Sequence, residues 1–224
     1  MLCVYCWDEP IGYTEAYDIQ RAFWTQNLAA ESPDTLLLLQ HSPTFTIGKS
    51  GKLENLLLDS DELAQIGVRF YFTDRGGDIT YHGPGQLVAY PIIDLRRRGK
   101  DVHGYIRDLE EVVIRTLADF SIDAYRDEKH VGVWVDNDKI AAIGVRIRKW
   151  VTMHGLALNV NPSLEYFSCI NPCGIVEKGV TSMARVLSRN VSVGEVTIRL
   201  VDNFSKVFTT HIEGVMNGTQ ESGL

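Results

Sequence analysis

Residues 131–147 read VGVWVDNDKIAAIGVRI, and this stretch decides the predicted fold class. Two runs rich in β-branched residues, Val131–Val135 and Lys139–Ile147, flank the polar segment Asp136-Asn137-Asp138. A short polar turn between two such runs is typical of a β-hairpin, in which neighbouring strands are antiparallel. The stretch therefore predicts a sheet that is at least partly antiparallel.

The rest of the chain extends this pattern outward. Further strands are expected at Leu2–Trp7, Thr35–Gln40, Thr44–Ile47, Val68–Thr73, Ile79–Tyr81, Leu87–Ile93 and Leu156–Val160. Helices are expected at Glu15–Ala29, Asp61–Ile66, Val102–Phe120, Thr181–Leu187 and Glu195–Val215. Thr14 is the expected N-cap of the first helix, and Thr44–Ile47 the expected hairpin partner of Thr35–Gln40. Because most strands follow one another across short turns, we predict an α+β fold with a mixed, largely antiparallel sheet packed with helices.

Size and composition fit one globular domain. The chain has 224 residues, of which 45% are hydrophobic and 23% charged, values that exclude disordered and fibrous classes. No internal repeat or long linker divides it. We therefore expect a single domain over residues 1–215 and a flexible tail over residues 216–224, which read MNGTQESGL.

Charge and cysteine content narrow the function class. A net charge of −7 disfavours nucleic-acid binding through general electrostatics, although the basic clusters 96–100 and 146–149 could still meet an acidic partner. No apolar run approaches the ~20 residues of a membrane span, and the first residues do not resemble a secretory signal. Four cysteines in a chain of this length do not form a disulfide scaffold. These features predict a cytoplasmic protein.

Several familiar sequence motifs are incomplete in this chain. Gly48-Lys49-Ser50 resembles the end of a P-loop, but Pro43 occupies the position of its first glycine. Gly83-Pro84-Gly85 does not continue into a dinucleotide-binding fingerprint. Four cysteines could hold zinc, but Cys3 and Cys6 lie on a predicted strand, where residues three apart face opposite sides. A zinc-stabilised, non-catalytic binding module therefore remains only as an alternative from another functional class.

Three segments combine chemistry with tight backbone geometry: RGGDITYHGPGQ at 75–86, KIAAIGV at 139–145, and HGLALN with INPCG at 154–159 and 170–174. The first packs four glycines among polar side chains, which indicates backbone exposed to a ligand. The second places one lysine at the start of a predicted strand whose middle residues have small side chains. The third holds a cysteine between proline and glycine, where a loop thiol can serve as a nucleophile.

Each segment alone also has a structural interpretation. Two tight turns would explain the glycines, Lys139 could be the exposed end of a hairpin turn, and His154 could be a structural histidine. Together, however, RGGDITYHGPGQ, KIAAIGVRI, HGLALNV and INPCG closely resemble the lipoyl(octanoyl) transferase family, in its order and at its spacing.

The resemblance implies a single domain of the biotin/lipoate protein ligase, or cofactor transferase, type. It implies transfer of octanoyl from octanoyl-acyl carrier protein to a lysine of lipoyl domains, as in 2-oxoacid dehydrogenases or glycine cleavage H protein, with no cofactor. Cys173 would be the acyl-thioester nucleophile and Lys139 its partner. The predicted substrate-binding residues are Arg75, Gly76, Gly77, Asp78, Ile79, Thr80, Tyr81, His82, Ala142, Ile143, Gly144, His154, Gly155, Leu156 and Ala157. Gly76, Gly77 and Gly174 offer candidate backbone donors to an oxyanion.

Two alternatives share the expected fold. An ATP-dependent lipoate or biotin ligase would pass through an acyl-adenylate and would not need a nucleophilic cysteine. An octanoyl amidotransferase, which moves octanoyl between proteins, would also use a cysteine. The pairing of Cys173 with Lys139 favours the transferase over the ligase.

Overall fold

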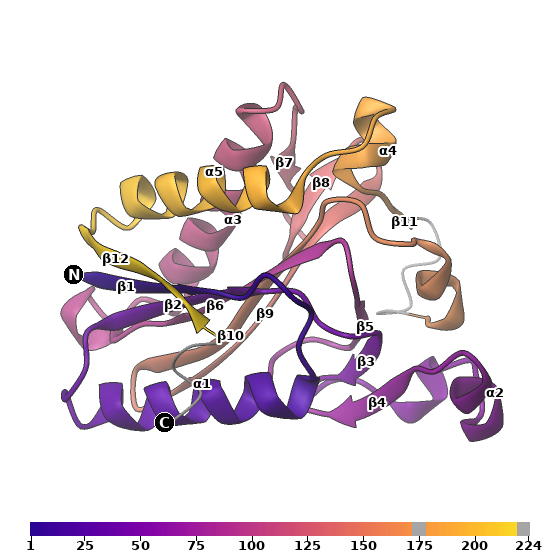
Figure 1. The fold of residues 1–224 in the computed structure, drawn as a ribbon, viewed down its shortest axis with the longest axis horizontal. Helices are drawn as coiled ribbons and strands as arrows, with labels where there is room; N and C mark the ends of the chain where they lie inside the picture. The colour runs from indigo at the N-terminus through magenta and orange to yellow at the C-terminus, as the bar shows by residue number, and fades with distance from the viewer. Residues whose placement is uncertain (172–177, 219–224) are drawn as a thin grey trace.

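The computed structural model describes residues 1–171 and 178–218, and Figure 1 shows their arrangement. The strands are β1 (Leu2–Cys6), β2 (Asp34–Leu39), β3 (Thr44–Ile47), β4 (Arg69–Phe72), β5 (Ile79–His82), β6 (Gln86–Ile92), β7 (Tyr125–Arg126), β8 (Val133–Val135), β9 (Asp138–Arg148), β10 (Val151–Asn159), β11 (Gly179–Val180) and β12 (Ile212–Asn217). The α-helices are α1 (Tyr13–Leu28), α2 (Ser60–Gln65), α3 (Val102–Ala118), α4 (Met183–Leu187) and α5 (Val193–Val207). Among these helices, none is long and apolar enough to cross a membrane.

Two sheets organise the described part of the chain. The large sheet has the order β12-β1-β2-β6-β10-β9-β8-β7, with β11 also paired to β9, and the small sheet has the order β4-β3-β5. Pairs β1–β12, β1–β2, β9–β11 and β3–β4 are parallel, and the other pairs are antiparallel. The prediction of a mixed, largely antiparallel sheet is confirmed.

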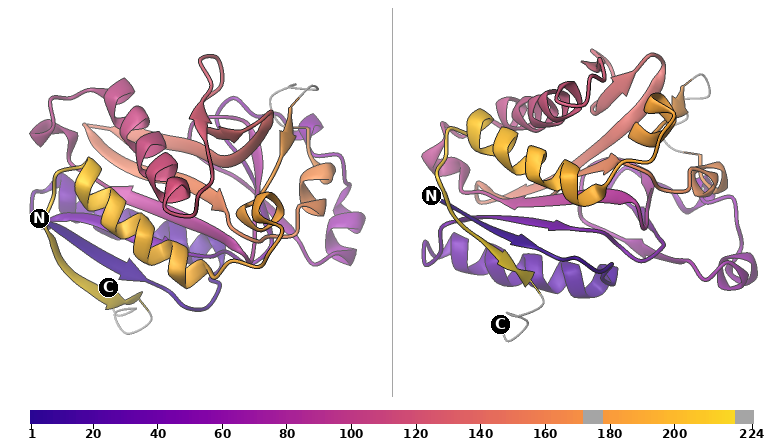
Figure 2. Two further views of the ribbon diagram at one scale, coloured as in Figure 1. Left: turned by 90° about the horizontal axis from the view of Figure 1, so that it is seen from above. Right: turned by 45° about the horizontal axis from the view of Figure 1, so that its top comes forward.

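Helices cover both faces of the large sheet. Figures 1 and 2 show α3 and α5 above the sheet and α1 below it, with the small sheet beside them. Leu109 and Leu117 of α3 and Leu200 of α5 are fully buried in the upper apolar layer, and Phe23 of α1 is buried in the lower one. Asp101 caps α3 by accepting the N–H of Gly104, which explains why this amphipathic helix begins where the sequence predicts.

The hairpin at residues 131–147 is confirmed, since β8 and β9 pair antiparallel. The expected pairing of Thr35–Gln40 with Thr44–Ile47 is wrong, because β2 lies in the large sheet and β3 in the small one. The buried side chain of His41 explains the difference. Its ring nitrogens bond the Ile11 carbonyl at 3.2 Å and the Tyr90 hydroxyl at 2.7 Å, which anchors the segment between the sheets.

Three expected boundaries also need correction. The N-cap of α1 is Gly12 rather than Thr14, and α4 begins at Met183, after the short strand β11. The expected helix 195–215 ends at Val207, because the chain then turns and pairs with β1 as β12. Met216 and Asn217, which fall in the expected tail 216–224, belong to this strand. Residues 219–224 lie outside the described residues.

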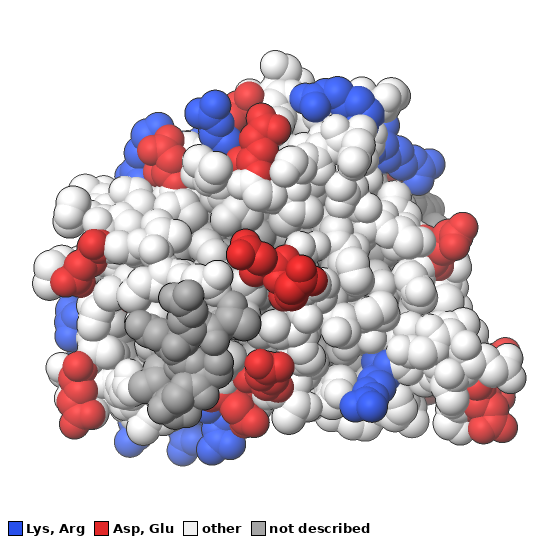
Figure 3. All heavy atoms as spheres, viewed as in Figure 1, with Lys and Arg blue, Asp and Glu red and all other residues white. Residues whose placement is uncertain are grey.

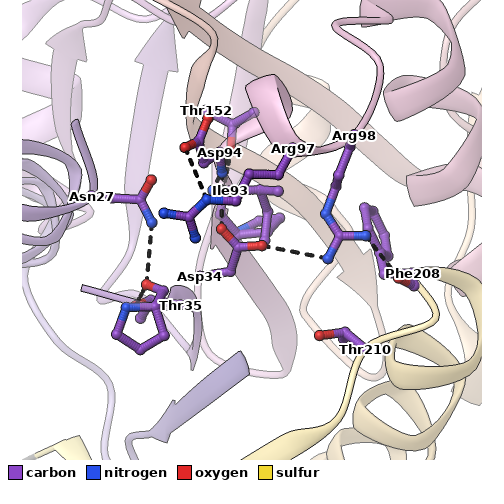
Figure 4. Close-up of polar contacts among 12 residues, drawn as sticks. Asn27, Asp34, Thr35, Ile93, Asp94, Arg97, Arg98, Thr152, Phe208 and Thr210 are labelled. Carbon is purple, nitrogen blue, oxygen red and sulfur yellow. Dashed lines mark hydrogen bonds and ion pairs between the residues drawn. The ribbon is translucent and has the colours of Figure 1, made fainter. Parts of the chain in front are cut away.

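Arginines of the basic cluster 96–100 form ion pairs with buried carboxylates of the fold (Figure 4). Two buried carboxylates, Asp34 and Asp94, are linked because the Asp94 N–H donates to Asp34 at 2.9 Å. Arg98 pairs with Asp34 at 3.4 Å, and Arg96 pairs with Asp94 at 2.7 Å. In the face shown in Figure 3, acidic and basic side chains are interspersed.

Asp34→Ala should lower the free energy of unfolding by about 2 kcal/mol, because it leaves a backbone N–H and a guanidinium without their buried acceptor. Urea denaturation measures the change. The matched control is Asp202→Ala, which removes only the exposed pair with Lys206 and should cost less than about 0.5 kcal/mol. Equal losses in the two variants would contradict a structural role for the Asp34 carboxylate.

Candidate active site

A cavity of about 310 Å³ lies against strands β5, β9 and β10. Of the residues predicted to bind substrate, it is lined by Arg75, Gly77, Asp78, Ile79, Thr80, His82, Ala142, Ile143, Gly144, His154, Gly155, Leu156 and Ala157. Lys139 lines it too. Three segments distant in the sequence thus meet at one hollow, of a size typical of small-ligand sites.

Two predicted residues do not line this cavity. The N–H of Gly76 donates to the Val145 carbonyl at 2.9 Å, so it joins the glycine loop to β9. This bond also removes Gly76 from the candidate oxyanion donors. Tyr81 is buried in a separate apolar cluster under the small sheet, where its ring stacks on Tyr166 with centroids 4.5 Å apart.

Arg75 holds the glycine loop in place. Its buried guanidinium donates to the Thr46 carbonyl at 2.6 Å, to the Asp78 carbonyl at 2.7 Å and to the Gly76 carbonyl at 2.9 Å. Gly144 allows the close approach, because a Cβ there would lie 2.8 Å from the Gly76 oxygen. Gly77 adopts φ +83°, a conformation that favours glycine. The contact between loop and strand therefore explains Gly76 and Gly144, and the backbone conformation explains Gly77.

A chain of neutral polar groups, His82, Gln86 and Asn159, forms part of the cavity lining. His82 Nδ1 lies 2.7 Å from Gln86 Oε1, and the Gln86 amide donates to Asn159 at 2.9 Å. Burial, followed by the nearby His41, lowers the pKa of His82 well below its usual value. Burial also lowers the pKa of His41 to about 4, so both imidazoles are neutral at pH 7. A neutral His82 that bonds the Gln86 oxygen carries its proton on Nδ1.

His154 occupies a strained position on β10. Its φ of +57° is unusual for a residue other than glycine. The backbone N–H donates to Gln20 at 2.9 Å, and Nε2 lies 2.7 Å from the Asp74 carboxylate, which also pairs with Arg146 at 3.1 Å. Burial lowers the pKa of His154, and its contact with Asp74 opposes that effect. Arg146, from the second basic cluster, is therefore also engaged within the protein.

Lys139 lies in the lining at the start of β9. Its ammonium lies 4.8 Å from the centroid of the Trp134 ring, and the Lys178 ammonium lies 4.2 Å from the same centroid. Both are cation–π distances. The N–H of Thr181 donates to the Lys139 carbonyl at 3.0 Å, so the start of β9 is tied to the strand that follows Lys178.

Cys173 and Gly174 lie outside the described residues, and no geometry is assigned to them. Ile170 and Lys178, which are described on either side of them, both line the cavity. Elsewhere in the described chain, burial and the nearby Asp8 raise the pKa of the Cys6 thiol to about 11, which disfavours a nucleophilic thiolate there. Cys3 contacts Glu213 at 3.6 Å, at the edge of the large sheet.

Several lining residues were not predicted from the sequence: Tyr13, Tyr90, Lys129, His130, Trp134, Phe167 and Lys178. They come from five separate parts of the chain and carry no motif. Within residues 1–171 and 178–218, no three His, Cys, Asp or Glu side chains gather as they would around a metal ion.

Comparison with known proteins agrees with this site. Residues 12–205 match the model of the lipoyl protein ligase A/B catalytic domain. The chain belongs to this family. It is 49% identical over 205 residues to the octanoyltransferase of Caldicellulosiruptor saccharolyticus, covering 91% of this chain and 87% of the relative. It is also 49% identical over 198 residues to the octanoyltransferase of Solibacter usitatus, covering 88% and 89%.

Solved structures confirm the predicted fold. The bipartite lipoate protein ligase of Thermoplasma acidophilum aligns with a TM-score of 0.68 at 18% identity, covering 99% of this chain and 88% of that chain. The Aquifex aeolicus biotin protein ligase, in complex with biotin and ATP, aligns with a TM-score of 0.54 at 13% identity, covering 92% and 70%. These likenesses establish the cofactor-ligase fold.

The buried histidines predict loss of stability in acid. At pH values above about 6.5, His41 is neutral in both the folded and the unfolded chain. Between about pH 6.5 and pH 4, His41 is protonated in the unfolded chain but stays neutral in the folded chain. The free energy of unfolding therefore falls as the pH is lowered across this window. The loss reaches about 3 kcal/mol for His41 alone, and His82 acts in the same direction.

Urea denaturation at pH 7, 6 and 5 measures this effect. His41→Gln should reduce the dependence of the unfolding free energy on pH in that window, even if it lowers the free energy itself. An unchanged pH dependence in the variant would show that His41 is not buried as a neutral imidazole.

Proposed function

We propose that this enzyme transfers octanoyl from octanoyl-acyl carrier protein to a specific lysine of a lipoyl domain, the first step of endogenous protein lipoylation. The near-half identity to curated octanoyltransferases supports this assignment. The single observation that carries it is the cavity that brings Lys139 together with the RGGDITYH, AIG and HGLA segments. An apolar slot with the Lys139 ammonium in its lining suits an acyl thioester.

The proposed reaction has two displacements. The Cys173 thiolate attacks the donor thioester carbonyl, and the carrier leaves as a thiol with the proton of the Lys139 ammonium, which leaves Lys139 neutral. The acceptor lysine, as a free amine, then attacks the enzyme thioester and forms an amide while Cys173 leaves as a thiolate. Since an amide is more stable than a thioester, the sequence of steps runs downhill without ATP.

Lys139 is proposed to act in both displacements. A free thiol has a pKa near 8.5, and lowering it by two units requires about 2.7 kcal/mol of differential stabilisation. An ammonium ~4 Å away at an effective dielectric of ~20 supplies up to ~4 kcal/mol before desolvation. In the second displacement, neutral Lys139 would accept the proton that the acceptor lysine loses.

The middle of the cavity is proposed to hold the acyl chain. Ala142 of β9 faces Ala157 of β10 in the antiparallel register, and both line the cavity together with Ile143 and Leu156. Small side chains on two adjacent strands leave space for methylenes, and each buried methylene contributes about 0.8 kcal/mol. Neutral His82 and His154 are proposed to orient groups in the cavity rather than to carry charge.

Cys173→Ala should abolish acyl-enzyme formation and lower octanoyl transfer by roughly 1000-fold or more, because it removes the nucleophile. Intact-mass spectrometry after incubation with octanoyl-acyl carrier protein detects the acyl-enzyme, which hydroxylamine should cleave. Cys6→Ser and Cys169→Ser are matched controls and should retain most of the activity. Loss of acylation in a folded Cys169→Ser protein would point to a different nucleophile.

The same assay separates the transferase from an ATP-dependent ligase. With ATP, magnesium and free octanoate in place of the acyl carrier, the enzyme should leave a lipoyl domain unmodified. Efficient modification under those conditions, retained in Cys173→Ala, would assign the chain to the ligases of this family instead.

Ala142→Leu should shorten the acyl chain that the enzyme accepts. If three methylenes lose their burial, the loss is about 2.4 kcal/mol, or about 60-fold in kcat/KM for octanoyl. Transfer of butyryl should change little. Ala64→Leu, on an exposed face of α2, is the control. A uniform loss for both acyl chains would place the chain elsewhere than beside Ala142.

A further inference from the structure

Two ammonium groups share the indole ring of Trp134. Lys139 approaches it from β9 and Lys178 from the residue before β11, at 4.8 Å and 4.2 Å from the ring centroid. The ring is fully buried, and its N–H donates to the His130 carbonyl at 3.2 Å, which fixes the plane of the indole. Since both ammoniums lie within 5 Å of one point, they lie within about 10 Å of each other. Lys178 therefore places a second positive charge beside the proposed catalytic lysine.

The Lys178 ammonium is paired with a carboxylate, that of Asp127. Asp127 forms an ion pair with Lys178 and also accepts the backbone N–H groups of Lys129 at 2.8 Å and His130 at 3.0 Å. The contact with Lys178, and then these N–H donors, hold the pKa of Asp127 well below its usual range, so Asp127 is charged at neutral pH. Lys178 lines the cavity, whereas Asp127 does not. The ion pair thus presents its positive end to the cavity.

We propose that the Lys178–Asp127 pair is a positioning element for Lys139. The Lys178 ammonium, held over the same indole, makes it easier for the Lys139 ammonium to lose its proton. The inference rests on the proposed role of Lys139 as proton acceptor in the second displacement. Lys178 acts through Lys139 and has no chemical step of its own.

The reaction gives a reason for such an element. An ordinary lysine has a pKa near 10.4 and is almost wholly protonated at pH 7, which makes it a poor proton acceptor. A cation ~10 Å away at an effective dielectric of ~20 lowers that pKa by about one unit, and the Asp127 charge behind it reduces the effect. The indole face opposes the shift, because it favours the cationic form of lysine.

Other charges around Lys139 act on it from the surrounding elements. On its own strand, Asp138 precedes it; from α3, Glu110 accepts the N–H of Gly132, whose backbone packs against the Lys139 side chain. The remaining charged or titratable groups in the lining are Tyr13, Arg75, Asp78, His82, Tyr90, Lys129, His130 and His154. Of these, His130 also contacts the Trp134 ring, with ring centroids 6.1 Å apart, and its Nδ1 lies 3.0 Å from the Asp127 carboxylate. Lys178 is the group to vary because it is the ammonium that shares this ring with Lys139 in the described contacts.

Titration of Lys139 by NMR tests the proposal directly. Reductive methylation with ¹³C-formaldehyde labels each lysine, and Lys139→Arg identifies the Lys139 resonance. Lys178→Gln should raise the pKa of Lys139 by about half to one unit, because the neighbouring cation is gone. Asp127→Asn should lower it, because the Lys178 charge is then unopposed. Lys206→Gln, on the exposed face of α5, should leave it unchanged.

Shifts of opposite sign in the two variants are the expected result, and a purely structural disturbance would not produce them. Lys178→Arg keeps the charge and should preserve the wild-type titration, which guards against loss of folding in Lys178→Gln. An unchanged Lys139 pKa in folded Lys178→Gln, or shifts of the same sign in both variants, would overturn the proposal.

The titration does not depend on octanoyl transfer. A wild-type enzyme that forms no acyl-enzyme would refute the proposed function while the opposite shifts still established the charge coupling. In an active enzyme, Lys178→Gln should also move the pH profile of transfer from the acyl-enzyme to higher pH, with acyl-enzyme formation measured separately.

Discussion

The placement of the Arg75 guanidinium is the constraint on which the rest of the site depends. A buried cation needs hydrogen-bond acceptors for its donors, and here the Thr46 hydroxyl supplies them together with backbone oxygens of β3 and of its own loop. Satisfying Arg75 therefore fixes the glycine loop, the small sheet and β9 relative to one another. The cavity lies between those three elements and β10, so its shape follows from a polar requirement as much as from apolar packing.

Local patterns were sufficient to predict much of this architecture. The hairpin around Asp136-Asn137-Asp138 and the amphipathic helix from Val102 were predicted because their signals lie within a few neighbouring residues. The pairing of β2 with β3 was wrong because a buried contact of His41 with Tyr90, far along the chain, takes β3 into a second sheet. The end of α5 was misplaced because pairing with β1 takes the segment after Val207 into a strand.

Some residues of the candidate site could likewise be predicted from the sequence, and others could not. The resemblance to the transferase family predicted the residues of the RGGDITYH, AIG and HGLA segments, because only the first segment shows a cluster of glycines and polar side chains by itself. Most of these residues line one cavity. Trp134 and Lys178 could not, because a tryptophan in a hairpin strand and a lysine in a loop are ordinary until the fold places them together. The proposed nucleophile, Cys173, rests on sequence and family alone.

The pairing of β12 with β1 sets when the fold can be completed. Cys3 of β1 contacts Glu213 of β12, 210 positions away in the chain, and β1 lies between β12 and β2 in the sheet. Contacts of such sequence separation carry a large loop-closure entropy and form late in folding. During synthesis on the ribosome, β12 is therefore made after every other described element. Until then, the edge of β1 that pairs with β12 is open. Until then β2 is its only lateral neighbour, and an open edge is a place where strands of other chains can pair.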